Sequence, residues 1–448
     1  MPNLTLLLMK HSNYLQYRTK IEFNDMKTYK FIFCIALATF AIASCNNDDV
    51  ISPENGSYNE PPLPTESHPA KAIELTNTQQ NISKSLQTFS WDIFEVISNQ
   101  QKNSGENQNV IFSPLSLEVD LAMLLNGLQG ETLQELLEIM HLSGYTINEI
   151  NQYFNNLSEG IIEADNATKF SSSNSLWYNK RYQLIPDFEQ TLKEYNNCEF
   201  FPVVYGDETT KKINKWAEER TYGRINHIID YTSSDDIYHL INAVYFRSRW
   251  RNGKSKCGAK TFTNANGTTK QVEMFKGETY GHITTSEFSS TIMPFSNSAF
   301  GMFFILPNEG VSFSEVYQAI KSSGETFSKM PNSQEVIVTL PIFEAENEIY
   351  LTSVLRNIDG EELLSKVNGV EIFKNLSLSI PPVIKQIANI SVDEEGAEAA
   401  AVTIFGDVSA GPPEQTQPLY LTFDRPFIFG IVERSTGMPL FIGEIVKM

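Results

Sequence analysis

The sequence predicts a mixed α+β protein in which helices come first and mostly antiparallel strands follow. Apolar residues within residues 86–97 recur with helical spacing. Three dense apolar runs end at polar residues or proline, as buried strands do. These runs are residues 241–246, 302–306 and 336–340. Residues 420–446 are almost entirely strand-like, with a hairpin turn expected at Thr436 and Gly437.

Polar residues and proline mark the ends of these elements. Residues 100–108 are polar and contain Gly105, which predicts a loop after the first helix. Residues 110–112 predict a short buried strand, ended by Ser113 and Pro114. The remaining elements are expected as helices at residues 116–125 (capped by Ser116), 132–140, 186–195 and 213–219, and as a strand at residues 176–178.

The pattern stays globular from residue 76 to residue 448. A chain of 448 residues is long enough for two or three domains of average size. No linker longer than a loop interrupts residues 76–448, however. We therefore expect a single domain over this range.

The first 44 residues predict an export signal. A basic head at residues 26–30 precedes an apolar run at residues 31–43, which is too short to span a bilayer as a helix. The run leads into residues 42–45 (IASC), which resemble a bacterial lipobox. Met26 is therefore the expected start and Cys45 the lipidated first residue of the mature protein. A plain secretory signal with an incidental cysteine is the alternative.

Polar and proline-rich residues follow Cys45. Five prolines and few apolar residues predict an extended tether over residues 45–75. Asp48 and Asp49 lie directly after the cysteine and resemble the surface-export signal of some Bacteroidetes lipoproteins. We therefore expect a protein that is exported and lipid-anchored to the outer membrane, exposed at its outer surface or extracellular.

Composition and spacing exclude several classes of function. The chain carries 54 acidic and 34 basic residues, a net charge of −20 that repels the phosphates of nucleic acids. None of its six histidines lies at the spacing of a zinc motif, and no metal or cofactor is expected. Four cysteines cannot build a disulfide framework, and nothing in the sequence pairs Cys198 with Cys257.

Two short motifs look like enzyme sites but lack the required spacing. Residues 253–255 (GKS) look like the end of a phosphate-binding loop, yet Ser248 stands where that motif needs glycine. Ser409 lies within the glycine-flanked residues 406–411, without the spacing or context of a nucleophile elbow. The sequence therefore does not predict an enzyme.

One segment has no single obvious secondary structure. Residues 391–405 combine a run of alanines with Gly396 and β-branched residues, and residues 406–417 are small and polar. One interpretation is a flexible surface loop with a helical turn. The other is a segment that can occupy two positions, because its small side chains would let it insert between two existing strands. Alternate residues would then face a core, namely Ala397, Ala399, Ala401, Thr403 and Phe405.

This segment and five others resemble the serpin family. Residues 394–401 are close to the hinge of inhibitory serpins and comprise Glu394, Glu395, Gly396, Ala397, Glu398, Ala399, Ala400 and Ala401. The other matches are residues 109–116 (NVIFSPLS), 241–250, 339–343 (TLPIF), 424–429 (DRPFIF) and 439–443 (PLFIG). They run in order from about residue 80 to residue 446.

The resemblance implies a fold and an internal contact region. Serpins have three β-sheets, about nine helices and an exposed reactive-centre loop, here within a serpin domain at residues 76–448. The shutter under the central sheet would include Ser113, Ser116 and Gln386. Gln386 stands where the family usually has histidine, and Ser248 replaces a usual glycine. A glutamine at this position can still bridge by hydrogen bonds.

The resemblance also implies a function. An inhibitory serpin is a suicide substrate of serine-type, and also cysteine-type, endopeptidases. Loop cleavage forms an acyl-enzyme, and the freed hinge inserts into the central sheet and distorts the attached protease. We expect a monomer that forms a covalent complex with its target. A non-inhibitory surface binding protein is the alternative, which the small hinge residues disfavour.

Family spacing from the hinge places the reactive bond between Ala410 and Gly411. Val408 and Ser409 are the alternative residues before the cut. Small residues at this position favour an elastase-like target, whose primary pocket is shallow. The loop is longer than usual, and residues 412–417 carry the excess.

Overall fold

The computed structural model describes residues 62–105, 108–331, 334–355, 358, 370–378, 385–397 and 417–448. Residues 62–448 form one compact unit. The described part contains eight helices: α2 (Asn77–Ser104), α3 (Pro114–Leu125), α4 (Gly130–Ile139), α5 (Ile147–Ala164), α6 (Pro186–Asn196), α7 (Asp207–Arg220), α8 (Phe313–Ser323) and α9 (Leu351–Leu355).

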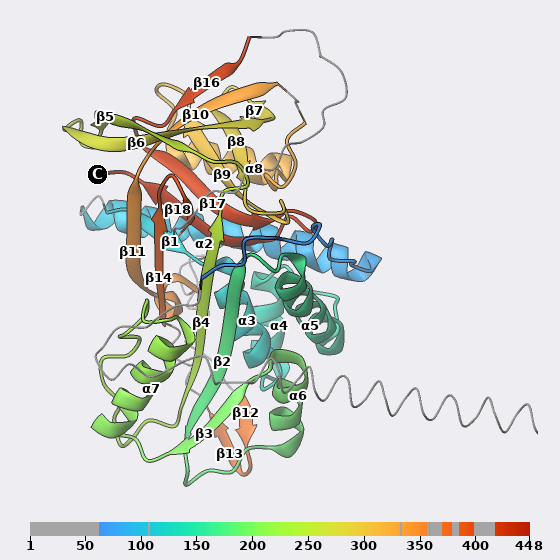
Figure 1. Cartoon of the computed structure of the whole chain (residues 1–448). Coiled ribbons are helices and arrows are strands. Elements are labelled where there is room, and N and C mark those ends of the chain that lie inside the picture. Colours follow the sequence, from blue (N-terminus) through green and yellow to red (C-terminus); the bar gives the residue numbers. More distant parts are fainter. Residues whose placement is uncertain are drawn as a thin grey trace, which may run out of the picture. The chain divides into compact units, whose positions relative to one another are not determined.

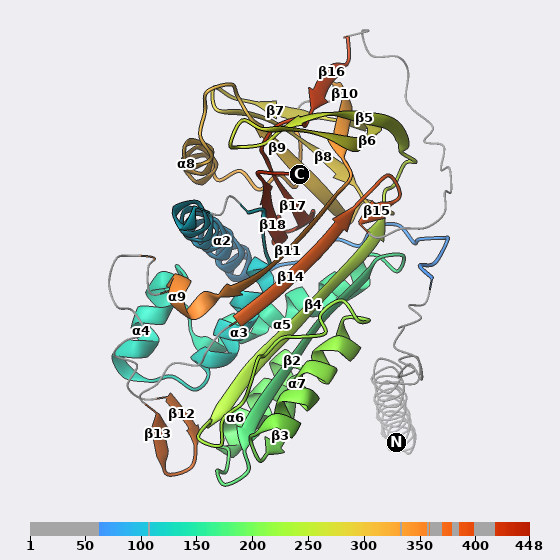
Figure 2. The same cartoon turned by 90° about the vertical axis from the view of Figure 1, so that its left-hand side faces the viewer.

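A six-stranded sheet, the central sheet, runs through the middle of the molecule (Figure 2). Its strands in spatial order are β11 (Phe343–Tyr350), β14 (Lys385–Val392), β15 (Gly396–Ala397), β4 (Tyr238–Arg249), β2 (Lys169–Asn179) and β3 (Glu199–Val203). In this sheet β2 and β3 pair in parallel. Every other neighbouring pair, from β11 through to β2, is antiparallel.

Two further large sheets and a small ribbon complete the strands. The second six-stranded sheet is β1 (Val110–Phe112), β18 (Pro439–Ile445), β17 (Phe427–Glu433), β9 (Phe300–Pro307), β8 (Phe288–Pro294) and β7 (His282–Thr284). The four-stranded sheet is β16 (Leu419–Thr422), β10 (Glu335–Pro341), β6 (Thr269–Tyr280) and β5 (Ser255–Thr263). The ribbon is β12 (Val370–Phe373) and β13 (Leu376–Leu378).

Helices cover both faces of the central sheet. Figure 1 shows α7 on one face and α3, α5 and α6 on the other. Successive side chains of β4 point to opposite faces of the sheet, so β4 contacts the helices on both sides. Leu240 and Phe246 join the main core, whereas Ile241 and Ala243 pack with Trp216 of α7. Strand β4 is therefore buried on both sides.

Most sequence-predicted elements are confirmed, including the apolar strands and the hairpin around Gly437. Several boundaries differ. Helix α7 begins at Asp207 rather than at residue 213, and strand β2 spans Lys169–Asn179 rather than residues 176–178. Helix α2 continues through the polar residues to Ser104, because Gly105 adopts a left-handed conformation that caps it. The N-cap of α3 is Ser113 rather than Ser116, since the Ser113 hydroxyl accepts from the Ser116 N–H and Pro114 begins the helix.

The prediction of a tether over residues 45–75 is wrong for residues 62–75, which pack against the body. We call residues 62–75 the strap. Leu63 and Ile73 are buried, and Ile73 lies against Gly160 of α5. Asn166 and Asn297 bind the strap backbone at His68. These partners lie far away in the sequence, so composition alone does not indicate them. Residues 45–61 lie outside the described residues.

Candidate functional site

The hinge begins with a tight reversal of the chain after β14. The Asp393 carboxylate accepts hydrogen bonds from the N–H groups of Glu395 (2.7 Å) and Gly396 (3.1 Å). The Asp393 N–H in turn donates to the Gly396 carbonyl. This turn sends β15 back antiparallel to β14, with Ala397 opposite Val392.

The first hinge residues already lie inside the central sheet. Gly396 pairs with Arg249 and Ala397 with Ser248 at the end of β4. Both hinge residues are buried, and Ala397 is only 2% exposed. A Cβ on Gly396 would lie 2.2 Å from the Ser248 carbonyl oxygen. Only glycine therefore permits the two strands to approach this closely.

Trp250 and Lys256 hold the turn in place. The Trp250 backbone N–H donates to the Glu395 carbonyl (3.1 Å), and its indole N–H donates to the Asp393 carbonyl (2.8 Å). The Lys256 ammonium lies 2.9 Å from the Glu394 carboxylate. Burial raises the pKa of Glu394, but hydrogen bonds from Lys256 and the backbone outweigh it, and the pKa is lowered overall. Lys256 is well exposed, so water screens this ion pair and it adds little to stability.

Beyond Ala397, the central sheet has an open seam between β4 and β14. Within the described residues, β4 pairs with β2 and β15, and β14 with β11 and β15, but no ladder joins β4 directly to β14. Figure 2 shows β4 and β14 side by side, with β15 between their ends. A small cavity lies here, lined by Val244, Phe246, Asn389, Ser391 and Ala397 among others. The seam thus offers backbone groups for a further strand.

The first turn of α3 bridges the seam from the core side. The Gln386 side chain of β14 makes two hydrogen bonds with the Ser113 backbone, at 2.8 and 2.9 Å. The Ser116 hydroxyl donates to the Asn242 side chain of β4. Ser113 and Ser116 are themselves linked through the helix cap. The structure therefore brings together the predicted shutter residues, and Gln386 bridges in place of histidine.

Asn242 extends this polar cluster into β2. Its amide donates to the Ser172 hydroxyl (3.0 Å) and to the Asn174 side chain (2.6 Å). Sequence reasoning did not select these residues. The available signal is Asn242 itself, a polar residue inside the apolar run 241–246. Buried amides of this kind need partners, so its neighbours on β2 follow from the strand pairing.

A loop crosses the other face of the seam. We call residues 221–237, between α7 and β4, the flap. Near its start, the Tyr222 ring lies 5.3 Å from the Tyr245 ring of β4. Further on, Asp230 accepts from the Tyr350 hydroxyl of β11 (3.3 Å) and pairs with Lys385 of β14 (3.3 Å). The flap is therefore attached to both sides of the seam.

Charges around Asp230 favour its ionised form. The His227 ring lies 2.8 Å from its carboxylate, and Lys385 also pairs with Glu348 of β11 at 3.0 Å. Hydrogen bonds from His227 and then Lys385 lower the pKa of Asp230. The flap contact is thus electrostatic and accessible to water.

Several predicted site residues lie outside the described residues. They are the later hinge residues Glu398, Ala399, Ala400 and Ala401, the reactive-bond residues Val408, Ser409, Ala410 and Gly411, and the lipidation site Cys45. Within the described part, Cys198 and Cys257 are free thiols, and no group of histidine, cysteine or acidic residues is arranged to hold a metal. No helix of that part has the length and apolarity needed to cross a membrane.

Comparison with known proteins shows the family. The model of the family "Serpin (serine protease inhibitor)" matches residues 84–448. An uncharacterized serpin-like protein of Thermococcus kodakarensis is 29% identical over 86% of this chain and 92% of its own length. The alpha-1-antiproteinase of Rattus norvegicus is 26% identical over 82% and 90%.

Solved structures show the same fold. Native tengpin, a thermophilic serpin, is 24% identical with a TM-score of 0.72, covering 86% of this chain and 97% of its own. Thyroxine-binding globulin in complex with thyroxine is 22% identical with a TM-score of 0.69, covering 82% and 99%. The family match agrees with the three large sheets and with the position of the hinge inside the central sheet. The chain belongs to the serpins, a family whose members are generally protease inhibitors.

Proposed function

We propose that this serpin is a suicide-substrate inhibitor of serine-type endopeptidases, and of cysteine-type ones that form the same kind of acyl-enzyme. The observation that carries the proposal is the position of Gly396 and Ala397 at the end of an open seam. Insertion of a cleaved loop into a serpin sheet is an established case of strand addition. In this mechanism the target protease performs the catalysis and the serpin is consumed.

The register of β15 supports insertion of the residues that follow. Ala397 pairs with Ser248, so an uninterrupted strand would bring Ala399 opposite Phe246 and Ala401 opposite Val244. Phe246 belongs to the main core, and a directly paired residue shares its face. The alanines would therefore fit under the sheet without steric conflict. Charged, bulky or proline residues at these positions would prevent insertion.

Strand completion supplies the driving force. About a dozen new ladder hydrogen bonds, at roughly 0.5–1.5 kcal/mol each, amount to on the order of 10 kcal/mol before side-chain burial. The native form is then held by kinetic barriers rather than by being the most stable state. The shutter contacts and the flap are the described contacts that insertion must rearrange.

The chemistry proceeds at the proposed reactive bond. The protease nucleophile attacks the carbonyl carbon of Ala410, the amide bond to Gly411 breaks, and Gly411 leaves as a new amine carrying the transferred proton. An ester, or a thioester for a cysteine protease, joins the protease to Ala410. Hinge insertion then moves and distorts the protease before water can hydrolyse this bond. Val408 and Ser409 remain the alternative attachment points, and small side chains favour elastase-like enzymes.

The decisive experiment compares two arginine substitutions with opposite expected orientations. Ala399→Arg would place a guanidinium under the sheet at a cost of several kcal/mol. Glu398→Arg, its matched control, would place the same group toward water. With pancreatic elastase, we expect the wild type and Glu398→Arg to form a complex stable on a denaturing gel, whereas Ala399→Arg is only cleaved. Equal complex formation by both variants would contradict hinge insertion.

Mass spectrometry of the released C-terminal peptide identifies the bond. A peptide that begins at Gly411, or at Ser409 or Ala410 for the alternative bonds, is expected from the stable complex. A peptide that begins at Gly406 would contradict this assignment, because cleavage after Phe405 leaves an inserted strand five residues shorter. Ala410→Arg should redirect trapping to trypsin-like enzymes, whose acidic pocket binds a guanidinium.

The proposal includes a lipid anchor at Cys45, with the serpin domain at the outer surface of the cell. Its support is the order of basic head, apolar run and IASC ending in the sequence. Cys45→Ala should release the protein from the membrane fraction or block its maturation. Unchanged fractionation and mass of that variant would show that Cys45 is not lipidated.

A further inference from the structure

Two exposed tyrosines lie on the four-stranded sheet. Tyr280 at the end of β6 is 65% exposed, and Tyr420 of β16 is 68% exposed. Figure 1 shows β16, β10 and β6 together at the top of the molecule. Single exposed apolar side chains are common on proteins, and only a shared surface indicates a binding site.

Strand β10 lies between the two tyrosines and joins them into one surface. Tyr420 pairs directly with Ile337 of β10, and Tyr280 pairs with Glu335 of the same strand. Directly paired residues share a face of a sheet, and so do residues two apart on one strand. These four side chains therefore lie on one face. The opposite face, which includes Val338, is buried in the core.

Two carboxylates border the tyrosines on this face. Glu278 pairs with Ile337 and is exposed, and Glu335 is half-buried opposite Tyr280. Neither carboxylate forms an ion pair with another residue of the described part of the chain. We call the set of Tyr280, Tyr420, Ile337, Glu278 and Glu335 the tyrosine surface.

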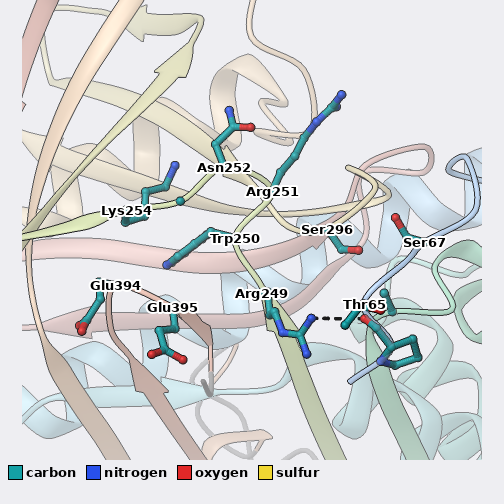
Figure 3. Close-up of a pocket in the computed structure, with 13 residues that line it drawn as sticks. Thr65, Ser67, Arg249, Trp250, Arg251, Asn252, Lys254, Ser296, Glu394 and Glu395 are labelled. Carbon is teal, nitrogen blue, oxygen red and sulfur yellow. Dashed lines mark hydrogen bonds between the residues drawn. The ribbon is translucent and has the colours of Figure 1, made fainter. Parts of the chain in front are cut away.

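Nearby lysines do not cancel this negative charge. Lys276 of β6 lies on the same face and is exposed. Lys254 precedes β5 and points away from Glu394 (Figure 3). Its side chain occupies the space beside Gly277 on the opposite face, from which its ammonium donates to the backbone carbonyl of Glu278 (3.3 Å). The outer face thus carries two carboxylates against one ammonium.

The chain that follows the proposed reactive bond enters the sheet beside the tyrosine surface. The Gln334 side-chain amide donates to the Gln417 carbonyl (2.7 Å), two residues before β16 begins. The Gln334 carbonyl accepts from the N–H of Gly281 (3.0 Å), the neighbour of Tyr280. Gln417 is therefore fixed at the edge of the sheet where Tyr280 lies.

Chain length brings a bound protease within reach of this surface. Seven residues lead from Ala410 to Gln417, and seven extended residues span at most about 25 Å. A serine protease of about 230 residues is roughly 45 Å across. The body of a protease bound at Ala410 is therefore larger than its greatest distance from Gln417, so the two surfaces can meet.

We propose that the tyrosine surface docks the body of the target protease, outside its active-site cleft. This inference rests on the proposed function, because it requires a protease at the reactive loop. The partner that fits is an elastase-like protease with apolar and basic side chains beside its cleft. Tyrosines supply large contact area at protein interfaces, and unpaired carboxylates steer a basic partner toward a chain of net charge −20. Docking therefore adds selection beyond the fit of the loop.

The rate of trapping of pancreatic elastase tests the tyrosine surface. The double variant Tyr280→Ala with Tyr420→Ala should trap elastase at least ten-fold more slowly than the wild type. The number of serpin molecules consumed per trapped elastase should not change, because docking precedes acylation and the hinge acts after it. Glu278→Gln with Glu335→Gln should slow trapping at about 50 mM sodium chloride but not at about 500 mM, where salt screens exposed charges.

Ile162→Ala is the matched control, because Ile162 is 64% exposed on α5, outside the tyrosine surface. It should trap elastase at the wild-type rate. Equal rates for the wild type and the tyrosine double variant would overturn the inference. Conversion of a wild-type dimer into a monomer by the tyrosine changes would also overturn it, because the surface would then join two copies. The glutamine pair keeps the test valid if the tyrosine variant fails to fold.

Loop cleavage in the Ala399→Arg variant separates docking from inhibition. Without insertion, kcat/KM for cleavage by elastase reports on docking alone, and the two tyrosine changes should lower it at least ten-fold. If the wild type fails to trap elastase but cleavage still depends on the tyrosines, the proposed function is wrong and the docking surface stands. Normal trapping that does not depend on the tyrosines would give the opposite result.

Discussion

At the scale of single residues, neutral side chains hold the two edges of the seam. Gln386 and Asn242 reach the same helix turn through Ser113 and Ser116, and none of these groups titrates near neutral pH. A histidine at the Gln386 position would make this contact sensitive to pH. The glutamine therefore removes a pH response from the shutter of this chain.

A buried carboxylate on β18 creates a pH dependence elsewhere. Glu444 accepts hydrogen bonds from Tyr317 (2.7 Å) and Ser98 (3.0 Å), and burial raises its pKa to about 6. Because the folded pKa exceeds the ordinary value of 4.5, the contribution of Glu444 to native stability is fully present below pH 4.5 and is lost as the pH rises through about 6. The shift corresponds to about 2 kcal/mol.

Glu444→Gln should remove this slope. Thermal midpoints measured at one scan rate between pH 4 and pH 7 should show the wild type losing stability relative to the variant across pH 4.5–6. Glu309→Gln changes an exposed carboxylate and is the control for net charge. Parallel pH profiles of the wild type and Glu444→Gln would mean that Glu444 ionises normally.

The residues of the site could be predicted only in part. Ser113, Ser116 and Gln386 were accessible through resemblance to the family pattern, and the structure joins them. Asn174 was not accessible, because its role depends on lying beside Asn242 across two paired strands. Such a contact follows from strand register, which local sequence does not specify.

At the scale of elements, the flap connects α7 to β4 and crosses the seam between β4 and β14. Its Asp230 contacts Lys385 and Tyr350 on strands that an inserting segment must move away from β4. In the proposed mechanism this contact would therefore oppose insertion. It is exposed, so its contribution is at most about 1 kcal/mol.

Asp230→Asn should loosen the flap and accelerate insertion by about two- to five-fold, as expected for a free-energy change of that size. Faster insertion lets fewer acyl-enzymes hydrolyse, so the number of inhibitor molecules consumed per trapped elastase should fall. Asp235→Asn, an exposed change in the same loop, is the matched control. An unchanged rate and stoichiometry in Asp230→Asn would show that the flap does not oppose insertion.

Local sequence predicted regular elements better than irregular ones. Apolar runs such as residues 302–306 identify strands because burial on both faces requires continuous hydrophobicity. The strap has no such signal. Its position depends on side chains from three distant parts of the chain, Asn166, Arg249 and Asn297. Proline-rich, polar composition therefore indicated a tether where the structure has a packed segment.

At the scale of the whole molecule, the open seam leaves a central sheet that is incomplete over the length of β4 beyond Ser248. The β4 and β14 edges carry backbone groups that a further strand would satisfy. Residues 398–418 connect β15 to β16, and this length of chain is enough to supply that strand after cleavage. In the proposed mechanism, completion of this sheet thus supplies the free energy that drives insertion.

Cleavage within residues 406–411 should therefore convert the protein into a much more stable form. A gain on the order of 10 kcal/mol in a domain of this size raises the thermal midpoint by roughly 10–15 °C. The measurement is thermal unfolding by circular dichroism before and after limited digestion with elastase, at one scan rate. Ala399→Arg, cleaved at the same bond, should show little or no increase, since its strand cannot enter the sheet. If the cleaved wild type unfolds at the same temperature as the intact protein, the seam does not accept the loop, and the non-inhibitory alternative would be favoured.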